Sequence, residues 1–344
     1  MPEFLLAEGF TIESLKEHFK LQELAAAGCK LKELIAAGYT TKQLKQGGFV
    51  AGDFNAIQTP AEELKEAGFT TTELYQGRYK AQELSAIGYS PADLRAGGYA
   101  AGELRSAGLA ADALKEGGYG AGDMHKAGYS TAELKLAGFP VKTLRLLAGA
   151  NAQALKDVGF SVEAMRAGGC SAEELAQTSP PYDARELYEG GFRAKQLRDV
   201  GFTASELRGA GLSVRELREA GRFGAAELFA LGVSAVELKG GGYPLKQLKE
   251  QVGLGPRELR ETGFSAAALE EIGFSAKQLR ECEYPIEEMA LCAFDAAALR
   301  AAGFTAIELK TNFKMNPKEL REGGYTMAEV KSAKYEARLM KSLQ

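Results

Sequence analysis

The sequence has no tryptophan, only two histidines, and four widely separated cysteines in 344 residues. It contains no run of about 18 apolar residues, so no helix is expected to span a membrane. The start, MPEFLLAEGF, lacks the basic and long apolar regions of a secretory signal. Few cysteines and no such signal favour a reducing setting inside the cell. We expect the cytoplasm or the cytoskeleton, and an organelle remains open.

The charge balance also excludes some partners. The formal net charge is -4, so the chain lacks the basic excess that is typical of nucleic-acid binding proteins. Glycine, by contrast, is abundant: 41 residues, well above the usual share of about 7%. The glycines recur at regular intervals, which directs attention to an internal repeat.

A decapeptide is repeated along the whole chain. The stretch STAELKLAGF, Ser130 to Phe139, recurs with substitutions as TTTELYQGRY, SPADLRAGGY and SAAALEEIGF. With the leucine of "EL" as an anchor, about 34 units follow one another from Leu5 to Met340, mostly at intervals of ten. We number the unit so that the anchor is position 5. Position 1 is then typically Ser or Thr, position 4 Glu, Asp or Gln, position 6 Lys or Arg, and position 8 Ala or Gly. Position 9 is usually Gly, and position 10 holds most of the Phe and Tyr residues.

Each unit reads as a short helix followed by a turn. Ser130 and Glu133 have the spacing of a capping box, in which the hydroxyl and the carboxylate bond each other's backbone amides. Gly138 stands where a helix ends on a left-handed residue. Helices this short are marginal alone, since isolated helices below roughly 12 residues are unstable in water. Stacking must therefore stabilise them, as in a solenoid. The same box recurs at Thr70/Glu73, Thr203/Glu206, Ser213/Glu216, Ser234/Glu237 and Thr305/Glu308.

We predict an all-α fold: an elongated solenoid of about 34 ten-residue helix-turn repeats, forming one continuous domain over residues 1–344. The interval from Leu175 to Leu187 is the longest and contains Pro180 and Pro181, so a kink or subdomain joint is expected at 177–183. The alternative is a right-handed β-helix like that of pentapeptide-repeat proteins. Long charged side chains oppose it, because a narrow β-helix would have to bury them. These side chains are Lys42, Lys142, Glu173, Lys195, Lys246, Lys277 and Glu287.

The GFSAxELKxA-type unit resembles the decapeptide arrays of short-helix repeat proteins, and this resemblance covers nearly all of the chain. The Gly-hydrophobic-Thr-x-x-Glu turn is also locally similar to the connection in small two-helix SHOCT-type modules. Neither resemblance implies an activity, and neither transfers a catalytic residue.

Residues able to carry chemistry all fall on repeat positions. His125 occupies position 6 and is expected on the surface, and His18 occupies position 8 and is expected to be half in the core. The cysteines occupy aromatic or alanine positions and are expected to act as small core hydrophobes. The glycine runs at 240–243 and 253–258 lack phosphate-loop spacing and fall at unit boundaries. We therefore predict no catalytic, cofactor-binding or metal-binding residue and no enzyme. The cysteines are Cys29, Cys170, Cys282 and Cys292.

The basic residues at position 6 allow two interpretations. They could align as a ridge that binds a polyanionic surface, such as an acidic filament. Alternatively, each could face the acids of neighbouring units and keep the repeat soluble, which the net charge of -4 favours. The residues concerned include Lys65, Arg95, Arg105, Lys115, Lys135, Arg145, Arg198, Arg208, Arg218, Lys239, Lys249, Arg280, Arg300 and Lys310.

The sequence is thus typical of a non-catalytic structural scaffold that docks on or braces a larger assembly, such as one of the cytoskeleton, through protein–protein contacts. The alternative is a regulatory adaptor that binds peptides or protein domains in a groove. No nucleic-acid partner is expected. Irregular units are the places to look for specific contacts, namely 50–59, Leu146–Leu147, Pro180–Pro181 and 311–316.

Overall fold

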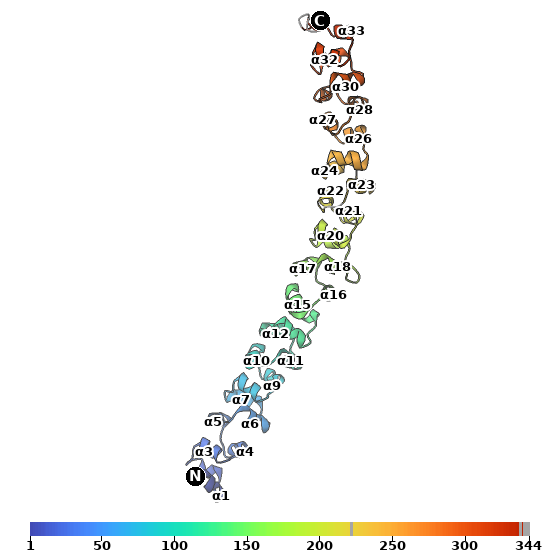
Figure 1. The fold of residues 1–344 in the computed structure, drawn as a ribbon. Coiled ribbons are helices and arrows are strands. Elements are labelled where there is room, and N and C mark those ends of the chain that lie inside the picture. Colours follow the sequence, from blue (N-terminus) through green and yellow to red (C-terminus); the bar gives the residue numbers. More distant parts are fainter. Residues whose placement is uncertain (221–222, 337–338, 340–344) are drawn as a thin grey trace. The chain divides into compact units, whose positions relative to one another are not determined.

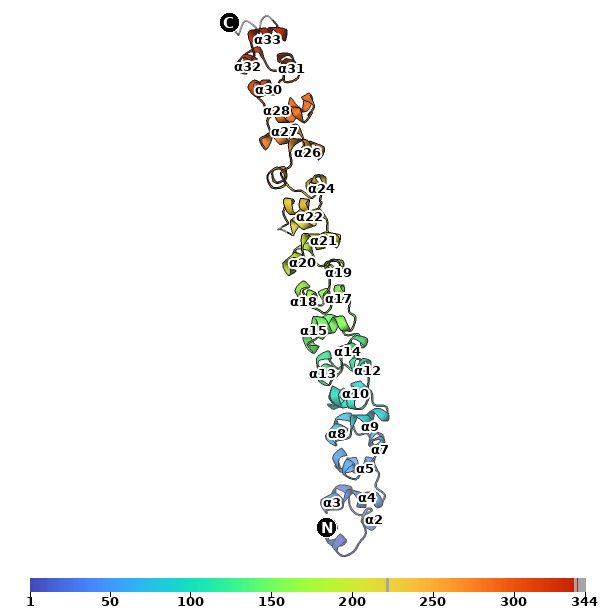
Figure 2. The same ribbon diagram turned by 90° about the vertical axis from the view of Figure 1, so that its right-hand side faces the viewer.

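The computed structural model describes residues 1–220, 223–336 and 339, and these residues form 33 short α-helices with no strand (Figures 1 and 2). Each helix contains one anchor, counting the π-helical turn Leu248–Val252 that continues α25. The anchors from Leu24 to Val330 are 0% exposed. The prediction of an all-α repeat solenoid is therefore confirmed and the β-helix alternative is wrong. The last expected anchor, Met340, lies outside the described residues.

The chain divides into two units, Met1–Pro181 and Tyr182–Gln344, and each is described by itself. The first contains α1 (Pro2–Ala7), α2 (Ile12–Leu15), α3 (Leu21–Ala26), α4 (Leu31–Ala36), α5 (Thr41–Gln46), α6 (Ala51–Ala56), α7 (Ala61–Glu66), α8 (Thr71–Gln76), α9 (Ala81–Ala86), α10 (Pro91–Gly97), α11 (Ala101–Ser106), α12 (Ala111–Glu116), α13 (Ala121–Lys126), α14 (Thr131–Leu136), α15 (Val141–Ala148), α16 (Ala152–Asp157), α17 (Val162–Ala167) and α18 (Ala172–Ala176).

The second unit contains α19 (Ala184–Glu189), α20 (Ala194–Val200), α21 (Ala204–Gly209), α22 (Val214–Glu219), α23 (Ala225–Ala230), α24 (Ala235–Gly240), α25 (Leu245–Gln247), α26 (Pro256–Glu261), α27 (Ala266–Glu271), α28 (Ala276–Glu281), α29 (Ile286–Met289), α30 (Ala296–Ala301), α31 (Ala306–Thr311), α32 (Pro317–Glu322) and α33 (Met327–Ser332). A joint at 177–183 remains our proposal.

Local bonds define both ends of each helix. In α14 the Ser130 backbone amide donates to Glu133 Oε2 at 2.7 Å, and the Glu133 amide donates back to Ser130 Oγ at 3.2 Å. At the other end Gly138 has φ +79°, its amide donates to the Lys135 carbonyl, and the Phe139 amide donates to the Leu134 carbonyl. This pair of bonds is the Schellman pattern, which stops the helix after six residues. The expected capping boxes and glycine stops are confirmed.

Each helix packs mainly on the second helix along the chain, and several also contact the next one. In the first unit α8 packs on α6 and α10, while α9 packs on α7 and α11, so successive helices alternate between two columns (Figure 1). Tyrosines at position 10 bond along a column: Tyr99 Oη donates to the Tyr79 carbonyl, and Tyr119 Oη to the Tyr99 carbonyl, both at 2.7 Å. The structural period is therefore twenty residues, two decapeptides.

Candidate functional site

The basic side chain at position 6 forms a bond that the sequence did not reveal. Lys115 of α12 reaches the end of α14, where its Nζ donates to the carbonyls of Ala137 and Gly138 at 2.8 and 2.9 Å. It also lies 5.1 Å from the ring centroid of Phe139. The last carbonyls of a helix have no partner within the helix and attract positive charge. We call this contact the position-6 bridge: a position-6 cation bonded to the end of the second helix along the chain.

The position-6 bridge accounts for most of the basic residues that were predicted to form a ridge. Arg145 and Arg208 instead pair with Glu174 and Glu237, and Arg95 lies over the ring of Tyr119. The ridge is thus engaged inside the repeat array, chiefly with carbonyls and rings. The predicted ridge residues that bond a carbonyl are Lys65, Arg105, Lys115, Lys135, Arg198, Arg218, Lys239, Lys249, Arg280, Arg300 and Lys310.

Some position-6 cations also contact the acid at position 4 three helices along the chain. Lys45 Nζ lies 2.7 Å from the Gly68 carbonyl and 2.9 Å from Glu73 Oε2, which belongs to a capping box. These pairs are partly exposed, so each contributes modestly to stability, on the order of 1 kcal/mol or less. Because the two helices are three apart along the chain, each pair joins one column to the other.

The pKa shifts have structural causes throughout. The backbone amide and hydroxyl of Ser130 lower the pKa of the Glu133 carboxyl, and Thr203 acts in the same way on Glu206. Burial raises the pKa of Tyr79 and Tyr119 to about 12. Such shifts are explained by caps and by the tyrosine column, so they do not point to an acid–base pair.

The singled-out histidines and cysteines are not brought together. His125 lies exposed on α13, as expected, but His18 is exposed as well and not half in the core. Cys29, Cys170 and Cys282 are buried, and Cys292 is half-buried. Burial, followed by Glu270, raises the pKa of Cys292 to about 11, which opposes thiolate reactivity. Within the described part of the chain, no group of His, Cys, Asp and Glu could hold a metal ion.

The two glycine runs form helix ends. Gly242 has φ +84° after α24, and Gly253 has φ +83° after the π-helical turn. Gly255 is the N-cap of α26, whose first residue is Pro256. Both glycine runs therefore lie at boundaries between repeats, where they end one helix or begin the next.

Five hollows on the described surface share one construction. Each lies between the turn that follows one helix and the last turn of a helix two or three further along. Where position 6 is a cation, as at Arg105 and Lys45, that residue lines the hollow and bonds a carbonyl. Two hollows have tyrosine at position 6 instead, one at Tyr75 and one at Tyr188. We call them the Tyr75 hollow (residues 75, 76, 78–82, 103, 106 and 107) and the Tyr188 hollow (residues 188, 191–195, 216, 219 and 220).

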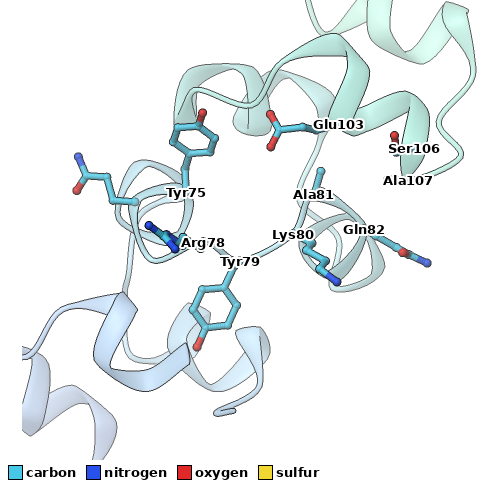
Figure 3. A pocket seen from close by; sticks show the side chains of 10 residues that line it. Tyr75, Arg78, Tyr79, Lys80, Ala81, Gln82, Glu103, Ser106 and Ala107 are labelled. Carbon is cyan, nitrogen blue, oxygen red and sulfur yellow. The ribbon is translucent and has the colours of Figure 1, made fainter. Parts of the chain in front are cut away.

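The Tyr75 hollow measures about 590 Å³ and is drawn in Figure 3. The Tyr75 ring packs edge-on against Tyr99, with centroids 4.9 Å apart, yet Tyr75 remains 42% exposed. The carboxylate of Glu103 faces Tyr75 across the hollow, with Arg78 beside Tyr75 and Lys80 pointing outward at the rim (Figure 3). In the Tyr188 hollow, by contrast, Tyr188 Oη donates to Glu216 Oε1 at 2.9 Å.

The irregular units keep the helix but alter its surface. In 50–59 the anchor Phe54 is 0% exposed, and Gln58 takes the left-handed backbone that glycine usually takes, with φ +63°. Lys314 does the same in 311–316, with φ +57°. Leu146 and Leu147, in the longer helix α15, are 72% and 61% exposed. The extra apolar surface expected there is present.

The fold and its bonds define an α-helical repeat protein built from decapeptides. The chain belongs to the decapeptide repeat family: the model described as "Decapeptide repeat region" matches residues 3–70, 58–130, 118–179, 181–253 and 253–313. The resemblance seen in the sequence is thereby confirmed. A search of curated proteins gave no match. Among the described residues, no helix is long and apolar enough to cross a membrane.

Proposed function

We propose that the chain is a non-catalytic structural scaffold that docks on or braces a larger assembly through protein–protein contacts inside the cell. The observation that carries this proposal is the use of the repeat positions. Positions 1 and 4 cap, position 5 is buried, position 6 bridges, position 9 ends the helix and position 10 packs. Because these positions recur with the same structural role, we infer that the stack serves to present its remaining exposed side chains to a partner.

The partner-binding surface is therefore sought away from the position-6 cations. An acidic filament lying on the Lys/Arg ridge would compete with carbonyls that already hold these side chains. The surface that remains available to a partner consists of the exposed positions 3 and 7, the hollows and the irregular units. Leu146 and Leu147 are the clearest apolar contact candidates, since they interrupt the repeat with exposed leucine.

Stoichiometry tests the proposal. The chain, tagged at its natural level and cross-linked in cells, is isolated and its partners are quantified by mass spectrometry. A scaffold predicts one assembly at a fixed ratio to the chain. Recovery of the chain alone would contradict the proposal.

A matched pair of variants then locates the contact. Leu146→Ser/Leu147→Ser is expected to lower the recovery of the assembly, because it removes apolar surface from an irregular unit. Leu136→Ser is the control, since Leu136 is 86% exposed in a regular repeat. Equal recovery with both variants would remove the 146–147 surface from the account.

The second candidate function is a regulatory adaptor that binds peptides in a groove. The Tyr75 hollow favours it, because that hollow measures about 590 Å³ and position 6 borders it with an aromatic ring in place of a cation. An adaptor predicts several partners, each recovered below the amount of the chain, in the same cross-linking experiment.

A further inference from the structure

We propose that the Tyr75 hollow binds an acidic peptide segment of a partner protein, with acidic side chains at Arg78 and Lys80 and an apolar side chain on the Tyr75 ring. This inference rests on the proposed function, because it names the chemistry of one docking contact. It concerns the first unit alone.

The first step of the argument is the missing bridge. In regular repeats the position-6 cation enters the hollow, bonds a carbonyl and pairs with the position-4 acid, as Lys45 does with Gly68 and Glu73. Tyr75 replaces that cation and turns to Tyr99. The Tyr75 ring thus takes the place of the cation beside Gly98 and Tyr99, and it borders the hollow with an aromatic face in place of a charge.

The second step is charge. Arg78 and Lys80 are exposed, and neither side chain has an ion-pair or hydrogen-bond partner among the described residues. Against these two positive charges the lining has one carboxylate, Glu103, whose Oε2 already accepts from the Ala100 amide at 2.8 Å. Arg78 also adopts φ +62°, a left-handed backbone that costs a non-glycine residue roughly 1–2 kcal/mol. The hollow thus has an excess of positive charge.

The four other hollows described above have no excess of positive charge. The Tyr188 hollow balances Arg193 and Lys195 with Glu216 and Glu219, and its tyrosine hydroxyl is bonded. The hollow near Lys45 balances that lysine with Glu73. The remaining two have more acidic than basic residues: Asp112 and Glu133 against Arg105, and Asp295, Glu319 and Glu322 with no cation.

The third step identifies the class of ligand. An open apolar ring beside two cations is complementary to a segment that alternates carboxylates with an apolar side chain. A nucleic acid is disfavoured, because Glu103 faces the hollow and the net charge of the chain is -4.

The test measures fluorescence anisotropy of a fluorescein-labelled peptide, Glu-Glu-Leu-Phe-Glu-Glu, titrated with the full chain at low salt. We expect saturable binding that Arg78→Glu/Lys80→Glu weakens roughly tenfold or more. The matched control is Arg193→Glu/Lys195→Glu in the Tyr188 hollow, which makes the same change of charge and is expected to leave binding within about twofold. Equal weakening by both variants would overturn the proposal, because it would show only general charge attraction.

A second variant separates the hollow from its charge. Tyr75→Lys restores a position-6 bridge: the new lysine is expected to bond the end of α10, and the aromatic face that would receive the apolar side chain is lost. Binding should then fall although positive charge is added. Tighter binding by Tyr75→Lys would overturn the proposal, as would an absence of peptide binding to the unmodified chain.

The remaining outcomes distinguish partners and proposals. Stronger binding of a labelled oligothymidylate, or of Lys-Lys-Leu-Phe-Lys-Lys, would contradict an acidic peptide as the ligand. If the acidic peptide does not bind while cross-linking still recovers one assembly at a fixed ratio, the inference fails and the scaffold function stands. If the peptide binds while cross-linking recovers the chain alone, the scaffold function fails and the peptide-binding inference stands.

Discussion

At the residue scale, the spacing between stacked helices depends on small side chains at position 8. Gly77, after α8, has an ordinary φ of -75°, so its role is not conformational. A Cβ on Gly77 would lie 2.6 Å from the Cβ of Ala51 and 2.9 Å from the Gly52 backbone nitrogen. The start of α6 and the end of α8 are therefore in direct contact.

Gly77→Ala is expected to destabilise the chain by roughly 1–3 kcal/mol, because the backbone of α6 must move to admit the methyl group. Chemical denaturation followed by circular dichroism measures the change. Gly102→Ala is the control, since a Cβ there would be 4.0 Å from Ala127. That variant should be neutral or stabilising by up to about 1 kcal/mol, as alanine favours a helix interior. Equal destabilisation would contradict the stacking of α8 on α6.

The tyrosine columns predict a loss of stability at high pH. Burial raises the pKa of Tyr79, Tyr119, Tyr284 and Tyr325 from 10.0 to about 12. The unfolded chain therefore releases these protons first, and the free energy of unfolding should fall as pH rises from about 10 towards 12. Phenolate absorbance and helical ellipticity, recorded together, should change in the same pH range. Ionisation of all tyrosines near pH 10 with the helix intact would contradict the buried columns.

At the element scale, most helices are held by a cap, and many also by a position-6 bridge from another helix. Lys135 bridges α14 to the end of α16, with Nζ 3.0 Å from the Gly159 carbonyl and 4.8 Å from the ring centroid of Phe160. The methylene stem of Lys135 is half-buried. The bridge thus combines a charge–carbonyl bond with packing on a ring.

Lys135→Met is expected to destabilise the chain by about 1 kcal/mol, since it retains the stem and removes the charge from a helix end and a ring face. Lys142→Met is the matched control, because Lys142 is exposed at position 3 of α15. Thermal melts of both variants measure the difference. A larger effect at Lys142 would show that the bridges do not stabilise the stack.

The capping boxes predict a loss of stability in acid. Ser130 lowers the pKa of Glu133 below its ordinary 4.5, and Thr203 lowers that of Glu206. This stability is present above pH 4.5 and is lost as pH falls through the lower pKa of the folded chain. A pH titration of the melting temperature should therefore decline below about pH 4.5. Ser130→Ala should flatten part of that decline.

The sequence was sufficient to predict the helices, but it did not predict which helices pack on each other. Glu133 and Gly138 define the ends of α14 through bonds within ten residues, so local spacing was sufficient. The bond from Lys115 to Ala137 spans two decapeptides, and it exists only because α12 packs on α14. A ten-residue period does not tell which helices stack. The Tyr75 hollow was missed for the same reason, although tyrosine at a basic position was a visible signal.

At the scale of the whole molecule, stability comes from repetition. Most helices have six residues, and no helix of this length is stable alone in water. Capping contributes at most repeats, and packing contacts join each helix to others of the stack. We therefore expect that, in each of the two units, the individual helices unfold at the same time as the packing between them is lost.

Far-UV circular dichroism with a thermal melt tests this central claim most directly, on the full chain and on a peptide spanning Ser130 to Phe139. The account predicts a strongly helical spectrum and a cooperative melt for the chain, and no helix for the peptide. A β-type or coil spectrum for the chain, or a helical peptide, would contradict it.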